Sequence, residues 1–193
     1  MQTTEGTESL IRPRTVVITG VVLAAAALRV APHPMNFAPI GALALFGGAY
    51  FSTKKAAFTV PLLSLVAGDV FIGFHPLVPY VYASFLVSVV LGFWLRRKGK
   101  SAEHIAAATA ASAVQFFLVT NFAVWATSTG TYPKNAGGLI ACYVAGLPFF
   151  WNTLAGDAFY ASVLFGAMQL AEQRFPSLRE PLVGEAGQEL ALR

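Results

Sequence analysis

The sequence is poor in charged residues. Only 11% of its 193 residues are Asp, Glu, Lys or Arg, whereas soluble globular domains carry about 25%. Hydrophobic residues make up 56% of the chain, and 16 of them are phenylalanines. This composition argues against an ordinary soluble domain and predicts an integral membrane protein.

Cysteine is nearly absent, with Cys142 the single one. One cysteine excludes an internal disulfide and any paired-cysteine metal or redox site. The chain also lacks a Gly-x-Ser-x-Gly element, a phosphate-binding glycine loop, a recognisable triad and a His-Glu-x-x-His motif. We therefore expect no catalytic residues, no metal site and no cofactor, and a protein that is not an enzyme.

A net charge of +4 would suit nucleic-acid binding, but the distribution of that charge argues against it. The lysines and arginines stand in short blocks between apolar runs, and no basic stripe interleaved with aromatic residues is present. Short basic blocks at the ends of apolar runs are topology signals of membrane proteins. The expected surroundings are a lipid bilayer, with no nucleic-acid partner.

Long apolar runs mark six candidate membrane spans, since a helix needs roughly 20 apolar residues to cross the hydrocarbon. The second run is short, which suits a tilted or partly buried helix. The last run is too long for one span at 1.5 Å per residue. Pro148 divides it, so we expect a broken or re-entrant segment over residues 138–147 and a full helix over 149–171. The six runs are residues 15–30, 36–51, 56–74, 77–95, 105–126 and 138–171.

The basic residues provide an independent check on this count. With a cytoplasmic N-terminus, only Arg29 and Lys134 of the 13 lysines and arginines fall outside. The predicted fold class is therefore all-α, a polytopic bundle of six transmembrane helices over residues 15–171, with polar cytoplasmic tails at 1–14 and 172–193. The N-terminal segment lacks the pattern of a secretory signal, so the first run is expected to remain a span. The residues placed inside are Arg12, Arg14, Lys54, Lys55, Arg96, Arg97, Lys98, Lys100, Arg174, Arg179 and Arg193.

In this topology the unusual polar residues converge on the outer side of the membrane. The first outer turn alone, RVAPHPMNFAP, contains an arginine, a histidine, an asparagine and three prolines. We predict that this turn forms one wall of an outward-facing pocket. The candidate ligand-binding residues are Arg29, His33, Asn36, Asp69, His75, Tyr82, Asn121, Trp125, Tyr143, Asn152 and Asp157.

Two carboxylates carry most of this hypothesis. Asp69 lies about one turn inside the membrane boundary and needs a partner, for which Arg29 or His75 is the natural candidate. Asp157 lies near mid-membrane. Carboxylates inside a membrane are costly, and they mark functional sites or paired interiors.

Each candidate also has a structural interpretation. Aromatic residues gather at membrane interfaces, and amides within spans hydrogen-bond between helices for about 0.6–2 kcal/mol. The alternatives are interface aromatics for Tyr80, Tyr82, Trp125 and Tyr132, headgroup contact for Arg29, ordinary loop positions for His33 and His75, interhelical bonds for Asn121 and Asn152, and a small buried apolar role for Cys142.

Three stretches of the chain are RVAPHPMNFAPIGALALFGGAYF, FFLVTNFAVW and GLIACYVAGLPFFWNTLAGDAFYASVLFG. With them the chain resembles an uncharacterised bacterial family of six-helix membrane proteins. That family is itself similar to the substrate-binding S components of energy-coupling factor (ECF) transporters. The first resemblance covers residues 29–166, and the second rests on size, six helices and a face of small residues early in the chain.

The resemblance implies a function as well as a fold. An S component binds a vitamin or other micronutrient from outside and moves it across the bacterial inner membrane, together with a transmembrane coupling protein and two ATPases. Residues 31–39 would then act as a lid over the pocket. The alternative is an accessory or structural subunit of a larger membrane complex with no ligand of its own. The small residues implied to dock on the coupling protein are Ala38, Ala42, Ala44 and Gly48.

Overall fold

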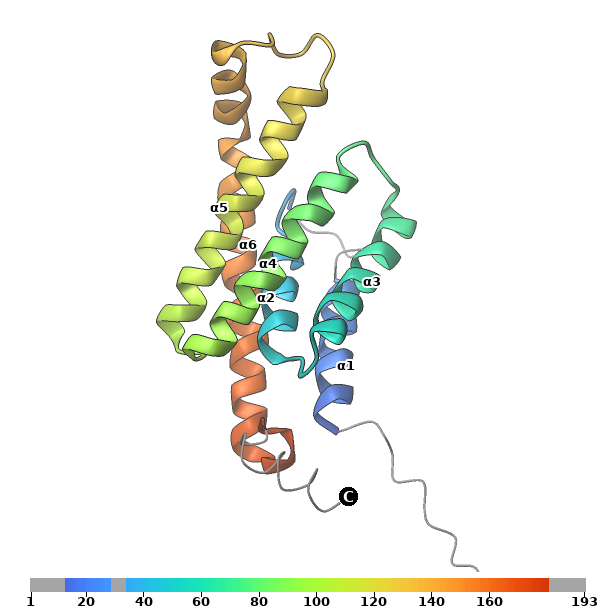
Figure 1. The fold of residues 1–193 in the computed structure, drawn as a ribbon, viewed down its shortest axis with the longest axis vertical. Helices are drawn as coiled ribbons and strands as arrows, with labels where there is room; N and C mark the ends of the chain where they lie inside the picture. Colours follow the sequence, from blue (N-terminus) through green and yellow to red (C-terminus); the bar gives the residue numbers. More distant parts are fainter. Residues whose placement is uncertain (1–12, 29–33, 181–193) are drawn as a thin grey trace, which may run out of the picture.

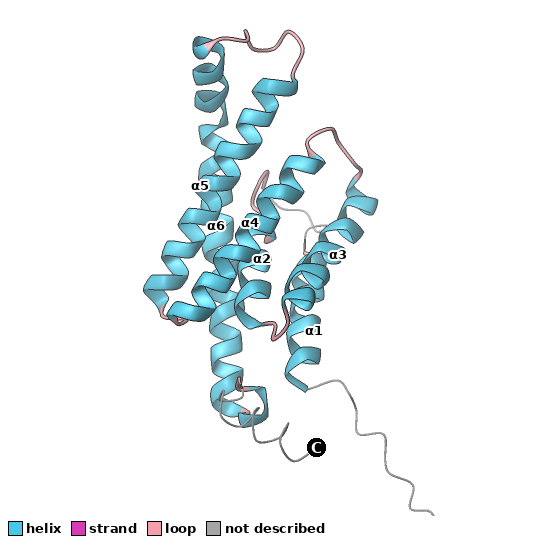
Figure 2. Cartoon of the chain, viewed as in Figure 1, coloured by secondary structure: helices cyan, strands magenta, loops and turns pink. Residues whose placement is uncertain are grey.

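The computed structural model describes residues 13–28 and 34–180, and within them the chain forms six α-helices and no strand (Figure 1). Figure 2 shows that short loops join most of these helices. Each helix coincides with one of the six apolar runs, which confirms the all-α fold class. The elements are α1 (Pro13–Ala27), α2 (Ile40–Tyr50), α3 (Lys54–Ile72), α4 (Val78–Lys98), α5 (Ala102–Thr127), α6 (Ala136–Arg174) and the 3-10 turn η1 (Pro176–Leu178).

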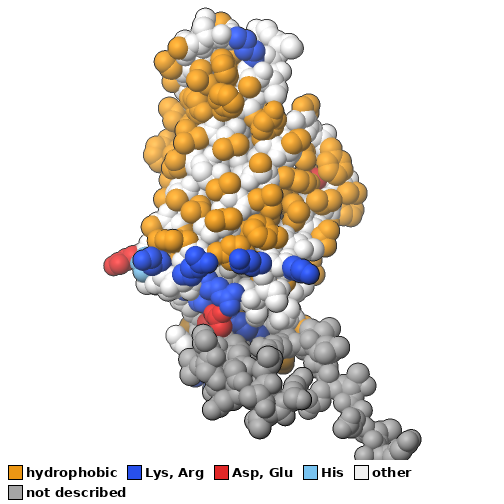
Figure 3. All heavy atoms as spheres, in the orientation of Figure 1, with side chains coloured by type: hydrophobic (Ala, Val, Ile, Leu, Met, Phe, Trp, Pro, Cys, Tyr) orange, Lys and Arg blue, Asp and Glu red, His pale blue; other side chains and the backbone are white. Residues whose placement is uncertain are grey.

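Four helices, α3 to α6, are long and apolar enough to cross a membrane. The 19 residues of α3 extend about 28 Å, close to the thickness of a hydrocarbon core. Helices α1 and α2 are shorter, with 15 and 11 residues. Large apolar side chains cover the outside of the bundle (Figure 3), and Phe71 and Trp151 are 79% and 62% exposed. An apolar surface of this extent suits lipid rather than water.

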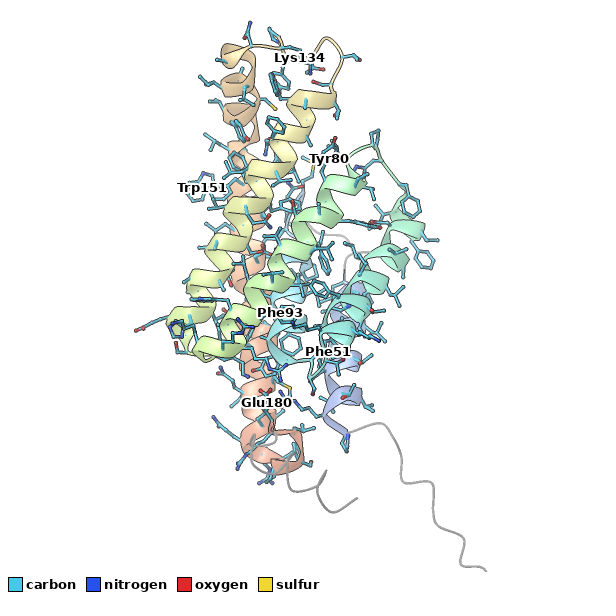
Figure 4. The ribbon with its side chains drawn as sticks, viewed as in Figure 1. Phe51, Tyr80, Phe93, Lys134, Trp151 and Glu180 are labelled. Atoms are coloured by element: carbon cyan, nitrogen blue, oxygen red, sulfur yellow. The ribbon has the colours of Figure 1, made fainter. Side chains whose placement is uncertain are left out.

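Basic side chains collect at one end of the bundle, which we call the basic end (Figure 3). Helices α1, α3 and α5 begin there, and α2, α4 and α6 end there. Lys134, in the α5–α6 loop, lies at the opposite or far end, as Figure 4 shows. This separation follows the charge pattern along the sequence. The described basic residues at the basic end are Arg14, Lys54, Lys55, Arg96, Arg97, Lys98, Lys100, Arg174 and Arg179.

Helix α2 lies at the centre of the bundle and packs against all five other helices. Nine of its 11 residues are buried. Its closest approach is to α4, where a Cβ on Gly48 would lie 2.2 Å from the carbonyl oxygen of Val89. A Cβ on Gly92 would likewise lie 2.4 Å from the oxygen of Leu45. The two glycines therefore allow the backbones of α2 and α4 to touch.

Helix α2 begins later than the apolar run that predicted it. Its first residue is Ile40, because Pro39 lacks an N–H and disfavours helical conformation in the residue before it. Asn36 has a left-handed backbone with φ of 62°. Residues 34–39 therefore form a non-helical segment, which packs closely on α6, since a Cβ on Gly156 would lie 3.1 Å from the Cα of Phe37.

The last helix corrects one prediction. Helix α6 runs without interruption through Pro148 for 39 residues, so the break expected over residues 138–147 is wrong. Membrane helices tolerate proline because neighbouring groups satisfy the freed backbone, and α5 packs directly beside this turn. A Cβ on Gly146 would lie 2.3 Å from Oδ1 of Asn121. Helix α6 is about 58 Å long, and the α5–α6 hairpin rises beyond the α3–α4 hairpin at the far end (Figure 1).

Charged side chains from three helices meet at the basic end. The guanidinium of Arg14 is buried, forms an ion pair with Glu172 at 2.7 Å and donates to the carbonyl of Tyr50 at 3.4 Å. Arg96 donates to the carbonyl of Phe51 at 2.7 Å. Cations at a helix C-terminus are favourable because exposed carbonyls carry partial negative charge there. The final turn of α2 is thus held by two arginines.

Candidate functional site

A backbone N–H at the start of α2 finds its hydrogen-bond acceptor in a carboxylate from α6. The backbone N–H of Ala42 donates to Oδ1 of Asp157 at 3.2 Å, while Pro39 in the cap position supplies no side-chain bond. Asp157 is only 2% exposed. A Cβ on Gly41 would lie 2.3 Å from Oδ2, so glycine is needed for this approach. A negative group at a helix N-terminus is stabilising, and Asp157 therefore has a structural partner as well as a candidate role in the site.

A cavity of about 210 Å³ lies beside this carboxylate, and we call it the inner cavity. It is enclosed by the segment 34–39, the start of α2 and four other helices. Its polar lining comes from four of these elements. The polar residues are Asn36, Ser88, Ser112, Thr153 and Asp157, and the others are Ala38, Ile40, Gly41, Ile72, Phe85 and Phe116.

A hydrogen-bond network between α4 and α5 fixes one wall of the inner cavity. The Oγ atoms of Ser88 and Ser112 lie 2.7 Å apart. Gln115 donates from Nε2 to the carbonyl of Ser84 at 2.9 Å and to Oγ of Ser88 at 3.1 Å. Such a network holds two helices in a fixed register, because each polar group would be costly if left alone in an apolar interior.

A second cavity of about 500 Å³ lies nearer the far end, and we call it the outer cavity. It shares Asn36, Ile40 and Phe116 with the inner cavity, so the two adjoin. Four of the predicted ligand-binding residues line it. They are Asn36, Asp69, His75 and Asn121, and further polar lining comes from Thr120, Tyr132 and Cys142.

Asp69 is buried and accepts a hydrogen bond from the hydroxyl of Tyr82, with 2.7 Å between the oxygens. The sequence predicted Arg29 or His75 as the partner of Asp69, and Arg29 lies outside the described residues. The Nδ1 atom of His75 instead accepts from the backbone N–H of Leu77 at 3.3 Å and shapes the α3–α4 loop. Tyr82 therefore contributes to the site through Asp69.

Three other predicted site residues, Trp125, Tyr143 and Asn152, line neither cavity and instead hold parts of the chain together. Asn152 fastens the segment 34–39 to α6, so it acts on the site indirectly. Arg29 and His33 lie outside the described residues. The three side chains donate to backbone carbonyls: Trp125 Nε1 to Pro133 at 2.9 Å, Tyr143 Oη to Leu118 at 2.8 Å and Asn152 Nδ2 to Met35 at 3.0 Å.

The small residues implied as a docking face lie inside the bundle. Ala42, Ala44 and Gly48 are buried, and Ala38 is half-buried beside the inner cavity. These residues pack within the chain, and Gly48 in particular must be small because the backbone of α4 lies directly against it. In the conformation described, the bundle covers Ala42, Ala44 and Gly48, and the docking role stays a prediction.

Several site residues were missed by the sequence reasoning. Ser88 and Ser112 line the inner cavity, Gln115 supports them, and Thr153 lies across from them on α6. Hydroxyl and amide groups inside apolar spans were the available signal, although only the packing of α4 on α5 shows that these residues meet. Among the described residues, no three His, Cys, Asp or Glu side chains lie close enough to hold a metal ion.

A family model matches residues 9–178, which include all six helices and both cavities. The chain belongs to the family of unknown function DUF6580. No curated protein and no solved structure matches the chain. Membership of DUF6580 supports the coarser part of the predicted resemblance, a family without an assigned activity. The likeness to ECF S components stays a prediction.

Proposed function

We propose that this DUF6580 protein binds a small molecule in its two adjoining cavities and takes part in the uptake of that molecule, in the manner of an ECF S component. The observation that carries the proposal is the pair of cavities of about 500 and 210 Å³, with polar groups from five elements converging on them. Ligand sites are typically concave and mostly apolar, with a few polar groups that orient the ligand. Binding, rather than catalysis, is the proposed role.

The charge distribution supports a direction for this uptake. Membrane proteins retain Lys and Arg on the cytoplasmic side, so we place the basic end in the cytoplasm of a bacterial inner membrane and the outer cavity towards the outside. The chain contains no nucleotide-binding motif. ATP-driven uptake would therefore require ATPase subunits and a coupling protein as partners.

Thermal unfolding of the detergent-purified protein against a panel of vitamins and their precursors tests the proposal. A ligand at 100 times its dissociation constant stabilises by about 2.7 kcal/mol. The change Ser88→Ala removes a hydroxyl from the inner cavity and is expected to reduce the shift. Ser64→Ala is the matched control, because both hydroxyls donate to the carbonyl four residues earlier, at 3.2 and 2.9 Å. A panel without any shift, or equal loss in both variants, would refute ligand binding at this site.

The second candidate, an accessory subunit of a larger membrane complex, is favoured by one lipid-facing surface. Ala158 and Ser162 are exposed on α6, and a Cβ on Gly166 would meet nothing within 4 Å. Small residues spaced four apart allow another helix to approach closely. Stable co-purification in mild detergent with membrane proteins other than a coupling and ATPase module would favour this role.

A further inference from the structure

Most hydroxyl hydrogens around the inner cavity are already used within the chain. The hydroxyl oxygen of Ser88 lies 3.2 Å from the carbonyl oxygen of Ser84 and 2.7 Å from Oγ of Ser112, and either serine can be the donor in the 2.7 Å pair. Thr153 donates to the carbonyl of Phe149 at 3.0 Å. Thr153 therefore offers a ligand oxygen lone pairs, and Ser88 and Ser112 together offer at most one free hydroxyl hydrogen.

The amide of Asn36 and the carboxylate of Asp157 complete the polar lining. Asp157 is the one charged side chain among the described residues that line the inner cavity. The N-terminus of α2 offsets roughly half of its unit charge, because a helix end carries about +0.5. The ionised form of Asp157 thus leaves part of a negative charge for a ligand to balance, in a cavity that is partly open.

Two aromatic rings lie in the same lining, those of Phe85 and Phe116. The face of an aromatic ring attracts cations within about 6 Å. Acceptor oxygens, a partly balanced carboxylate and aromatic rings all favour a ligand that brings positive charge and N–H groups. A carboxylate or phosphate would lie beside the carboxylate of Asp157, which repels it, and could accept hydrogen bonds only from the Asn36 amide and at most one serine hydroxyl.

We propose that the inner cavity selects a protonated nitrogen group, such as an amine, an amidine or a protonated nitrogen heterocycle, and excludes anionic groups. The volume of about 210 Å³ corresponds to roughly seven water molecules at liquid density, which suits a single-ring head group. This inference rests on the proposed function and specifies the chemistry of its ligand. Asp157 pairs with the nitrogen group, and Ser112 and Thr153 accept its remaining N–H groups.

Three ring-sized probes that differ in charge test this selectivity: benzamidine, benzyl alcohol and benzoate. Each is titrated into the purified full-length protein, with calorimetry and thermal unfolding as the measurements. Benzamidine is expected to bind at least about tenfold more tightly than benzyl alcohol, as a charge-assisted hydrogen bond implies. Benzoate is expected not to bind. Benzoate binding as tight as that of benzamidine would overturn the inference.

Two variants assign the preference to named atoms. Asp157→Asn keeps the size and the acceptor for Ala42 but removes the charge, and it is expected to abolish the tenfold preference for benzamidine. Glu103→Gln removes a carboxylate from the exposed first turn of α5 and is the matched control, expected to keep the preference. If Asp157→Asn does not fold, Ser112→Ala is expected to weaken benzamidine binding by about two- to tenfold.

The outcomes separate this inference from the function on which it rests. An unchanged preference in Asp157→Asn overturns the assignment, and so does the absence of binding by any probe. A neutral or anionic vitamin that stabilises the protein while benzamidine does not leaves the proposed function standing and removes only the charge selectivity. Absence of binding across both the probes and the vitamin panel removes both.

Discussion

Replacing Asp157 tests whether a carboxylate from α6 stabilises the start of α2. In the wild type the N–H of Ala42 donates to Oδ1 of Asp157 at 3.2 Å, and Asp157 is only 2% exposed. In Asp157→Ala this N–H loses its acceptor in a buried position. An unsatisfied buried donor costs about 1–3 kcal/mol. For a chain of this length, each kcal/mol lowers Tm by roughly 2–4 °C, so we expect a decrease of about 2–12 °C.

Asp157→Asn separates the hydrogen bond from the charge. The side-chain oxygen of asparagine can still accept from Ala42, so the expected cost is about 1 kcal/mol or less, the size of a charge–dipole interaction. Ser162→Ala, on the exposed face of the same helix, is the control and should change stability by less than about 0.5 kcal/mol. Far-UV circular dichroism during thermal and detergent unfolding measures all three. Equal stability of Asp157→Ala and the wild type would refute the capping role.

Three further predictions concern packing, charge and topology. Gly48→Ala should destabilise the folded protein by about 1–3 kcal/mol or more, since the added Cβ would lie 2.2 Å from a backbone oxygen of α4. Gly166→Ala is the control: its Cβ would have open space around it, so the change should be neutral or stabilising in the same unfolding assay. Arg14→Ala should cost about 3 kcal/mol, because it breaks a buried ion pair, and an unchanged Tm would contradict this. The topology is tested in a protein whose native cysteine has been replaced. A cysteine introduced at Lys98 should react with membrane-impermeant thiol reagents only from the cytoplasm, and one introduced at Lys134 only from outside. Labelling of both cysteines from the same side would exclude the proposed topology.

Helix number and the separation of charge were predictable because both depend on local composition. An apolar run of about 20 residues is a helix in lipid, since no other conformation satisfies its backbone there. The late start of α2 was also readable in principle, because Pro39 restricts the residues on either side of it. The helix break predicted at Pro148 was wrong, since proline ends helices in water more reliably than it does beside a packed helix in a membrane.

The site itself was only partly predictable, because it depends on which helix faces meet. Asp69, Asn121 and Asn36 were grouped from their shared depth, and the three line the outer cavity. The bond from Tyr82 on the next helix to Asp69 was not predicted, and neither was the serine pair of α4 and α5. The spacing of Ala44 and Gly48 identified a close-packed face but not its neighbour, which at Gly48 is α4 of the same chain. Depth follows from sequence position, whereas facing partners follow from tertiary packing.

The bond between Ala42 and Asp157 joins residues 115 positions apart, and this separation has a consequence for biogenesis. Helix α2 leaves the ribosome long before α6, and its 11 residues, about 16 Å, are too short to cross the hydrocarbon alone. The N–H groups at its amino end therefore lack the carboxylate of Asp157 until the final helix has been synthesised, and until then the translocation machinery or water must surround them. Nascent chains truncated before α6 should accordingly be the species that quality-control proteases recognise.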